Sequence, residues 1–223
     1  MNTKYQNRPV IIAICGKSAT GKDTLASWLL SMLKVSNIPV NMIISDTTRP
    51  PRIFEKDGVD YNFLTESEFH YKINNGDYLE YSHFNNWFYG TDRQSIILNS
   101  INIGVFNIDG MSSLANCQAD FEVICVYLKC GLIQRLFRSY NRERKFKIEY
   151  IRRAHTDHYD FKNVKDILKC FPNQFIFDSQ QIPIVSMVDH IIWRLKIKNF
   201  LIFRVSLNTL EKVVKHKNPT DKC

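Results

Sequence analysis

The sequence lacks the cysteine patterns of zinc or disulfide scaffolds. It has six cysteines but no Cys-x-x-Cys pair and no histidine spaced to complete a zinc site. Two of them, Cys15 and Cys125, fall within apolar runs, where a free cysteine behaves as a small apolar residue. We therefore expect six reduced thiols in a cytoplasmic protein.

Long apolar runs are also missing. Residues 1–9 are polar, and the apolar run that follows is too short for a secretory signal. The stretch 182–203 is apolar in places, but five charged or titratable side chains interrupt it, which argues against a membrane span. These are Asp189, His190, Arg194, Lys196 and Lys198. No repeat or low-complexity tract is visible, and we expect no membrane partner.

Acidic residues are fewer than basic ones, 22 against 30, which gives a formal net charge of +8. Such a charge favours anionic partners, either nucleic acid or polyphosphate substrates. Much of the excess lies at 135–153 and at 194–222, and we interpret the second stretch as a solvated basic helix and tail. We expect no specific nucleic-acid partner. A chain of 223 residues can bury one substantial core, as a monomer or a homodimer.

A glycine-bounded loop follows an apolar run, residues 10–15, that has the length and β-branched content of a buried strand. The spacing Gly-x4-Gly-Lys between a strand and a helix is typical of a phosphate-binding loop. There, backbone N–H groups, the helix N-terminus and the lysine attract phosphate oxygens. We predict that this segment binds the phosphates of a nucleotide. Its residues are Gly16, Lys17, Ser18, Ala19, Thr20, Gly21, Lys22, Asp23 and Thr24.

The residue after the loop lysine departs from the usual serine or threonine, whose hydroxyl helps to hold Mg²⁺. Here it is Asp23, and a carboxylate is also an oxygen ligand for Mg²⁺. The alternative is that Asp23 is a solvated acid favoured by the helix dipole. Thr24 can still reach a phosphate from the first helical turn.

Strands alternate with helices along most of the chain, which predicts an α/β fold with a parallel sheet flanked by helices. Residues 45–90 are an exception, where short strands and one helix predict a small α+β insert. The patterns place strands at 10–15, 61–63, 78–84, 87–89, 104–108, 121–128 and 174–177, and a further strand that ends near residue 44. They place helices at 22–34, 66–74, 93–102 and 131–139, a further helix that ends at about residue 160, and a long one near the C-terminus.

The insert carries two arginines three residues apart, Arg49 and Arg52, and two later tyrosines, Tyr61 and Tyr89. Paired guanidinium groups with tyrosine hydroxyls suit a phosphate dianion. The alternative is a solvated loop in which the arginines form a salt bridge to Glu55.

A lone carboxylate, Glu80, is accompanied by serine and threonine hydroxyls in the same insert. This set suits a base that presents two adjacent N–H donors and one carbonyl acceptor. Guanine is such a base, with N1–H, N2–H₂ and O6.

Three runs in this order resemble the guanylate kinase family, over about residues 10–196. They are Ser45-x-Thr-Thr-Arg49-x-x-Arg52 with Gly58-x-x-Tyr61-x-Phe63, then Asn75-Gly76-x-x-x-Glu80, then Tyr89-Gly90-Thr91. The resemblance implies a P-loop kinase fold and Mg²⁺-dependent transfer of the ATP γ-phosphate to GMP or dGMP, giving ADP and GDP or dGDP. It implies that the acceptor phosphate is held by Arg49, Arg52, Tyr61 and Tyr89, and that guanine is read by Ser45, Glu80 and Thr91.

The sequence departs from the family pattern in two places. Ile53-Phe54 stands where the family has Pro-Gly, and the strand expected to read Leu-Asp-Ile-Asp-x-Gln-Gly runs from Phe106 to Ser112 with Asn107 and Met111 at two of its polar positions. Asp109 is retained at the end of a strand, where ligands of parallel sheets bind. We predict that Asp109 contacts the acceptor or, with Asp23, the metal; the alternative is a helix N-cap.

Six arginines crowd one predicted helix–loop–helix: Arg135, Arg138, Arg142, Arg144, Arg152 and Arg153. Phosphoryl transfer spreads negative charge, which cations stabilise. The resemblance matches Arg142 and Arg153 to the family's lid arginines, and we predict that they act in catalysis with Lys22, Arg49 and Asp109. The alternative is a basic helical face without a ligand. On the adenine side the candidate is Asp178.

These patterns divide the chain into a P-loop core of residues 1–44, 92–137 and 156–223, a GMP-binding insert of residues 45–91 and a lid of residues 138–155. The expected ligands are ATP, GMP or dGMP, and Mg²⁺. Alternatives on the same fold are a ribose 1,5-bisphosphate phosphokinase, whose relatives also tend to have Asp after the loop lysine, and a deoxynucleoside monophosphate kinase of broader base choice. A further alternative is a non-catalytic guanylate-kinase-like module that binds proteins.

Overall fold

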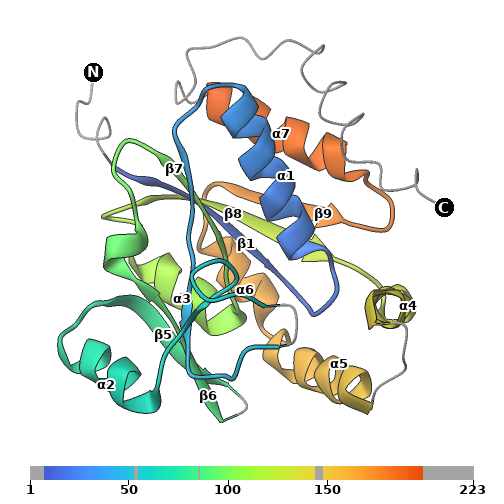
Figure 1. Cartoon of the computed structure of the whole chain (residues 1–223). Coiled ribbons are helices and arrows are strands. Elements are labelled where there is room, and N and C mark those ends of the chain that lie inside the picture. The colour runs from blue at the N-terminus through green and yellow to red at the C-terminus, as the bar shows by residue number, and fades with distance from the viewer. Residues whose placement is uncertain (1–7, 53–54, 85, 144–147, 198–223) are drawn as a thin grey trace.

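A computed structural model describes residues 8–52, 55–84, 86–143 and 148–197 (Figure 1). Its central sheet has five parallel strands in the order β2-β7-β1-β8-β9. The strands are β1 (Val10–Gly16), β2 (Val40–Met42), β7 (Ile101–Val105), β8 (Glu122–Lys129) and β9 (Gln174–Asp178). Parallel strands place their carboxyl ends at one edge, so the loops that follow them meet there.

Helices cover both faces of this sheet (Figure 1). Alternate residues of β1 point to opposite faces, so Ile12 and Ile14 pack with α1 (Lys22–Val35) and α7 (Ile184–Ile197). Ile11 and Ala13 pack on the other face, against α3 (Ile108–Asn116) and α6 (Val164–Lys169). Burial on both sides explains why β1 is an unbroken apolar run.

The insert is a second, four-stranded sheet in the order β4-β3-β6-β5. Its elements are β3 (Asp46–Thr47), β4 (Asn62–Phe63), α2 (Glu66–Asn74), β5 (Tyr78–Phe84) and β6 (Trp87–Asp92). Buried Asp46 joins them, since it accepts hydrogen bonds from Asn62, from Lys72 and from the Tyr78 hydroxyl at 2.9 Å. Phe69 stacks on Tyr78 with ring centroids 4.5 Å apart. The insert therefore has an apolar and ionic centre of its own.

Two further helices, α4 (Leu132–Glu143) and α5 (Ile148–Asp160), contact each other beyond the carboxyl ends of the strands (Figure 1). None of the described helices is both long and apolar enough to cross a membrane. The five cysteines within the described ranges are all free thiols, and Cys223 lies outside those ranges.

The predicted fold class is confirmed, since a parallel sheet is flanked by helices. The helix predicted at 93–102 is wrong: a single 3₁₀ turn, Arg93–Ser95, is followed by a loop in which Asn99 has a φ of 57°. The strand predicted at 104–108 is shifted, and β7 ends at Val105 because Asn107 caps α3. The division into core, insert and lid stays a prediction.

Candidate active site

The phosphate loop joins β1 to α1 at the carboxyl edge of the sheet. Only glycine fits at position 16, where a Cβ would come within 2.6 Å of the Leu128 carbonyl oxygen. Lys22 Nζ donates to the carbonyl oxygens of Gly16 and Lys17, at 2.7 and 3.0 Å. Burial lowers the pKa of Lys22, although nearby Asp23 opposes this effect. The lysine is thus held within the loop by backbone oxygens.

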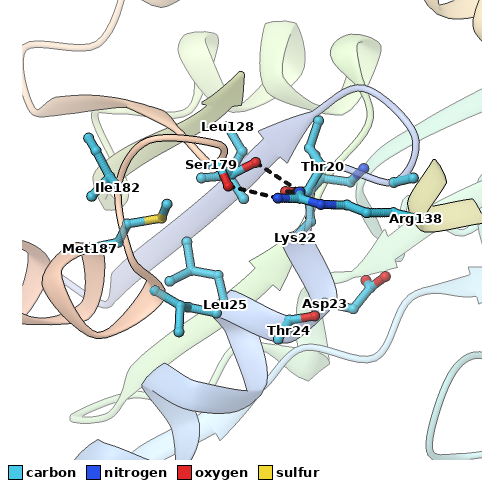
Figure 2. A pocket seen from close by; sticks show the side chains of 13 residues that line it. Thr20, Lys22, Asp23, Thr24, Leu25, Leu128, Arg138, Ser179, Ile182 and Met187 are labelled. Atoms are coloured by element: carbon cyan, nitrogen blue, oxygen red, sulfur yellow. Dashed lines mark hydrogen bonds between the residues drawn. The ribbon is translucent and has the colours of Figure 1, made fainter. Parts of the chain in front are cut away.

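A cavity of about 470 Å³ lies on one side of the loop (Figure 2). Its polar end consists of residues 19–24, so Ala19, Thr20, Gly21, Asp23 and Thr24 line it together with Lys22. Its apolar wall consists of Leu128 from β8, Ile182 from the loop between β9 and α7, and Ile184 and Met187 from α7. A cavity with a phosphate-binding end and an apolar wall has the chemistry needed for a nucleotide's phosphates and base.

Arg138 of α4 also lines this cavity, which we call the donor-side cavity because its loop residues are those predicted to bind ATP. Its NH1 donates to the Thr20 carbonyl oxygen at 3.1 Å and to Ser179 Oγ at 3.0 Å, and its NH2 donates to the Ser179 carbonyl oxygen at 2.7 Å (Figure 2). Arg138 is one of the six arginines of the predicted helix–loop–helix, but no individual role was predicted for it from the sequence. The candidate on the adenine side, Asp178, instead accepts a turn hydrogen bond from the Gln180 N–H at 3.0 Å.

A second cavity, of about 230 Å³, lies between the phosphate loop and the insert. Gly16, Ser18 and Lys22 line its loop side. The predicted acceptor residues Ser45, Tyr61, Glu80, Tyr89 and Asp109 also line it, as do two unpredicted carboxylates, Asp157 and Asp160. Burial raises the pKa of Tyr61 to about 12, which keeps its hydroxyl protonated even in alkaline solution. This acceptor-side cavity therefore brings residues of the core and the insert to one space.

Glu80 lines the acceptor-side cavity and is otherwise buried, with 9% of its surface exposed. The pairing of β5 with β6 sets it opposite Thr91, whose hydroxyl donates to Glu80 Oε1 at 2.6 Å. Burial raises the pKa of Glu80 to about 7; the Thr91 hydrogen bond lowers it and the charge of Asp109 raises it. Glu80 thus titrates near neutral pH, and its carboxylate is available to hydrogen-bond donors entering the cavity.

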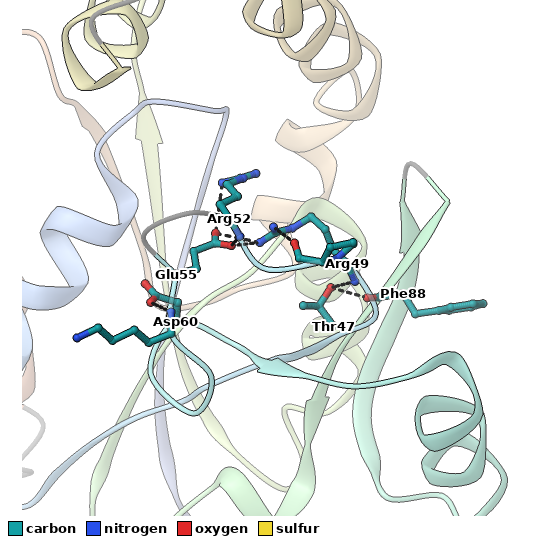
Figure 3. Close-up of polar contacts among 8 residues, drawn as sticks. Thr47, Arg49, Arg52, Glu55, Asp60 and Phe88 are labelled. Atoms are coloured by element: carbon teal, nitrogen blue, oxygen red, sulfur yellow. Dashed lines mark hydrogen bonds and ion pairs between the residues drawn. The ribbon is translucent and has the colours of Figure 1, made fainter.

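The paired arginines of the insert contact Glu55 (Figure 3). Arg49 NH2 donates to both carboxylate oxygens at 2.9 Å, and Arg52 NH1 approaches Oε1 at 3.4 Å. The salt bridge weighed as an alternative is therefore present. Arg49 also lies over the Tyr61 ring, 5.4 Å from its centroid, so the arginines and the tyrosine are neighbours.

A third cavity, of about 220 Å³, shares Lys22 with the first two cavities and is lined by several cations. Lys22, Arg52, Arg135 and Arg153 reach it from four different segments, together with Asp23. Burial and the positive charges of Arg153 and Arg49 lower the pKa of Arg52. Cations held close together in this way form a site for a polyanion. The predicted partner of Arg153, Arg142, has a side chain outside the described part of the structure.

Asn107 and Asp109 both line the acceptor-side cavity, but they have different places in α3. Asn107 caps α3, since its Oδ1 accepts from the Gly110 N–H at 2.7 Å, and its Nδ2 donates to Ser82 Oγ at 2.7 Å. Asp109 lies in the first turn of α3 and faces the acceptor-side cavity. The alternative role for Asp109, that of the N-cap of a helix, is therefore wrong, since Asn107 is the N-cap of α3.

Asp157 was not predicted, yet it contacts the loop directly. Its carboxylate accepts from the backbone N–H of Ser18 and pairs with Arg135. The carboxylate occurs in a basic segment with no motif around it, so the sequence offered no signal.

Among the residues that the structure describes, no three His, Cys, Asp or Glu side chains are grouped so as to hold a metal ion. Mg²⁺ at phosphate-transfer sites commonly uses one or two carboxylates together with phosphate and water oxygens. Asp23 lines both the donor-side cavity and the cation-lined cavity, so its oxygen chemistry and position fit such a metal.

Comparison with known proteins identifies the family of the chain. The model of the family described as guanylate kinase matches residues 6–165. A guanylate kinase of Ehrlichia ruminantium (strain Gardel) is 32% identical over 147 residues, which cover 64% of this chain and 68% of that protein. One of Clostridium perfringens (strain 13) is 43% identical over 90 residues, and the match spans only 40% of its length. The crystal structure of a guanylate kinase from Anaplasma phagocytophilum shares the fold, with a TM-score of 0.58, 17% identity and coverage of 94% of this chain and 96% of that one.

Proposed function

Since the chain belongs to the guanylate kinase family, we propose that it transfers the terminal phosphate of ATP to GMP or dGMP, with Mg²⁺. One observation carries the proposal: the acceptor-side cavity is lined at one end by Lys22 of the phosphate loop and at the other by the buried carboxylate of Glu80. A nucleotide seated there has its phosphate toward the loop and its base toward Glu80.

The residues divide the work by their chemistry. Glu80 accepts hydrogen bonds from guanine N1–H and N2–H₂, and Ser45 and Thr91 add hydroxyls beside it. Adenine lacks these two donors, so the buried carboxylate keeps its Thr91 hydrogen bond but gains no partner from the base, and such mismatches discriminate strongly. Asp109, on the same cavity, contacts the acceptor nucleotide.

The cation-lined cavity is where the transferred phosphate passes. Lys22, Arg52, Arg135 and Arg153 face it and stabilise the charge that spreads over the moving group. Arg49 and the two tyrosines, Tyr61 and Tyr89, hold the acceptor phosphate. An acceptor phosphate is already mostly ionised near neutral pH, so no general base is needed. Asp23, together with the donor phosphates, would hold Mg²⁺, which would supply further charge neutralisation.

An ADP-release assay with ATP and Mg²⁺ tests the proposal, with GMP, dGMP, AMP, CMP, UMP and ribose 1,5-bisphosphate as parallel acceptors. We expect turnover with GMP and dGMP alone, its loss in Glu80→Ala, and its retention in Glu66→Ala, an exposed acid of the same insert. Turnover with the sugar phosphate assigns the chain to that phosphokinase class. Nucleotide binding without turnover assigns it to the non-catalytic modules.

A further inference from the structure

A carboxylate of the chain itself lies in the phosphate loop. Asp157 of α5 accepts from the Ser18 N–H, at 3.0 Å to Oδ2 and 3.2 Å to Oδ1, and from the Ser18 hydroxyl at 3.2 Å. Only 7% of Asp157 is exposed. Backbone N–H groups of such loops bind anions, and here the anion comes from a residue 139 positions along the chain.

Arg135 is the second group that Asp157 engages. Its NH1 lies 2.5 Å from Asp157 Oδ2 and 3.3 Å from the Ser18 carbonyl oxygen, and only 6% of the residue is exposed. Its Nε is buried and has no hydrogen-bond partner in the described part of the protein. A carboxylate has two oxygens and leaves this donor unsatisfied, whereas a phosphate group has more acceptor oxygens to offer. The arginine is therefore incompletely paired by Asp157.

Ser18 lies on the acceptor side of the loop. It lines the acceptor-side cavity and the cation-lined cavity, both together with Lys22, whereas the loop part of the donor-side cavity begins at Ala19. Of a chain of phosphates extending from the donor side, the terminal one therefore reaches Ser18 and Arg135. It would meet the Asp157 carboxylate there, and two anions cannot share the same N–H donors.

We propose that Asp157 is an internal substitute for the terminal donor phosphate: it holds Ser18 and Arg135 while the loop is empty, and a triphosphate displaces it. The inference rests on the proposed phosphate binding by this loop. It makes Asp157 a determinant of donor affinity that acts on triphosphates and not on diphosphates, whose shorter chain stops before Ser18.

The test compares wild type with Asp157→Asn, which keeps the shape of the side chain and removes its charge. Calorimetric titration measures Kd for a non-hydrolysable ATP analogue, for inorganic tripolyphosphate and for ADP. We expect the variant to bind the ATP analogue and tripolyphosphate about tenfold more tightly and ADP about as the wild type does. Asp157→Glu, which keeps the charge, and Asp166→Asn, an exposed aspartate paired with Lys169, should both resemble wild type.

If Asp157→Asn binds triphosphate equally well or more weakly than wild type, the proposal is overturned. The same holds if the substitution lowers kcat and leaves triphosphate affinity unchanged. If neither protein binds polyphosphate, the proposed function falls as well. Tighter binding by the variant without turnover of any acceptor leaves the inference standing and removes the kinase activity. Thermal unfolding verifies that each variant is folded.

A second measurement needs no variant. Carbodiimide labelling of carboxyl groups with glycine ethyl ester, measured by peptide mass spectrometry, reports how accessible each carboxylate is. Tripolyphosphate should increase the labelling of Asp157 in the wild-type protein and leave that of Asp166, whose side chain is 74% exposed, unchanged. Unchanged or reduced labelling of Asp157 would show that the contact persists in the complex and would refute displacement.

Discussion

The buried carboxylate of Glu80 should weaken the fold at the pH where the proposed reaction needs it. Its pKa is about 7 in the folded protein against 4.5 when unperturbed, chiefly because burial disfavours the charged form. Between these values the folded state holds a proton that the unfolded state releases, so the free energy of unfolding falls as pH rises from 4.5 to 7. The difference amounts to about 3 kcal/mol.

Glu80→Gln removes this charge and keeps the side chain's shape. The Thr91 hydroxyl, now 2.6 Å from Glu80 Oε1, can donate to the amide oxygen instead. At pH 8 we expect the variant to unfold with a free energy higher by about 3 kcal/mol, and at pH 5 by less than about 1 kcal/mol. Urea denaturation of both proteins at the two pH values measures the gain. Glu66→Gln, on the surface of the same insert, should change stability little at either pH.

The same substitution should weaken acceptor binding. A glutamine amide loses the charge-assisted hydrogen bonds to guanine and presents an N–H₂ group to the N–H donors of the base, so we expect GMP affinity to fall by about 2–3 kcal/mol, or roughly 30- to 150-fold. In the wild type, GMP affinity should drop about tenfold from pH 8 to pH 6 as Glu80 is protonated.

The urea denaturation has a clear refuting result. A stability gain in Glu80→Gln of equal size at pH 5 and pH 8, or no gain at pH 8, refutes the assignment of a neutral-range pKa to Glu80.

Three further substitutions test other parts of the structure. Gly90→Ala places a Cβ 2.9 Å from the Tyr78 ring, so it should destabilise the protein by about 1–3 kcal/mol in thermal or urea unfolding, and no loss would contradict the packing of the insert. Arg138→Ala removes the contacts to Thr20 and Ser179 beside the donor-side cavity, so steady-state kinetics should show KM for ATP raised about tenfold and KM for GMP little changed; equal effects on both would refute a donor-side role. Ala19→Gly relieves a φ of 60° in the phosphate loop and should leave stability unchanged or raise it by up to about 1 kcal/mol, measured by urea unfolding; a clear loss would show that this backbone conformation is not strained.

The parts of the fold that were predicted well depend on contacts close in sequence. The helix at Glu66–Asn74 begins where predicted because Thr65 and Glu68 form a capping box, and it ends where predicted, with Asn75 as its C-cap before Gly76 with its φ of 72°. The shifted strand near residue 104 depends on Asn107, whose cap begins α3 and ends β7 earlier than the apolar pattern suggests. A local pattern locates an element, whereas a competing side-chain contact sets its end.

In the candidate site, too, the residues that belong to local sequence motifs could be predicted. Short motifs identified Ser45, Tyr61, Glu80, Tyr89 and Asp109, and the structure places all five around one cavity, although their roles stay predictions.

The contacts of Asp157 and Arg138 with the loop could not be predicted. They join residues 139 and 118 positions apart and depend on how α4 and α5 lie against the phosphate loop beyond the carboxyl ends of the strands. Nothing local in the sequence encodes that packing.

The two halves of the site are prepared for their ligands in different ways. In the acceptor half, Glu80 has a hydroxyl partner in Thr91 and faces an open cavity, so a base can bind without breaking a protein contact. In the phosphate half, Lys22 is bonded to loop carbonyls and Ser18 to Asp157, so a triphosphate must exchange these contacts for its own. Asp157 also lines the acceptor-side cavity, but its hydrogen bonds go to Ser18 and Arg135 of the phosphate half, so we expect Asp157→Asn to change donor affinity far more than acceptor affinity. GMP titration of Asp157→Asn measures this directly, and a large change in GMP affinity would show that the two halves are coupled.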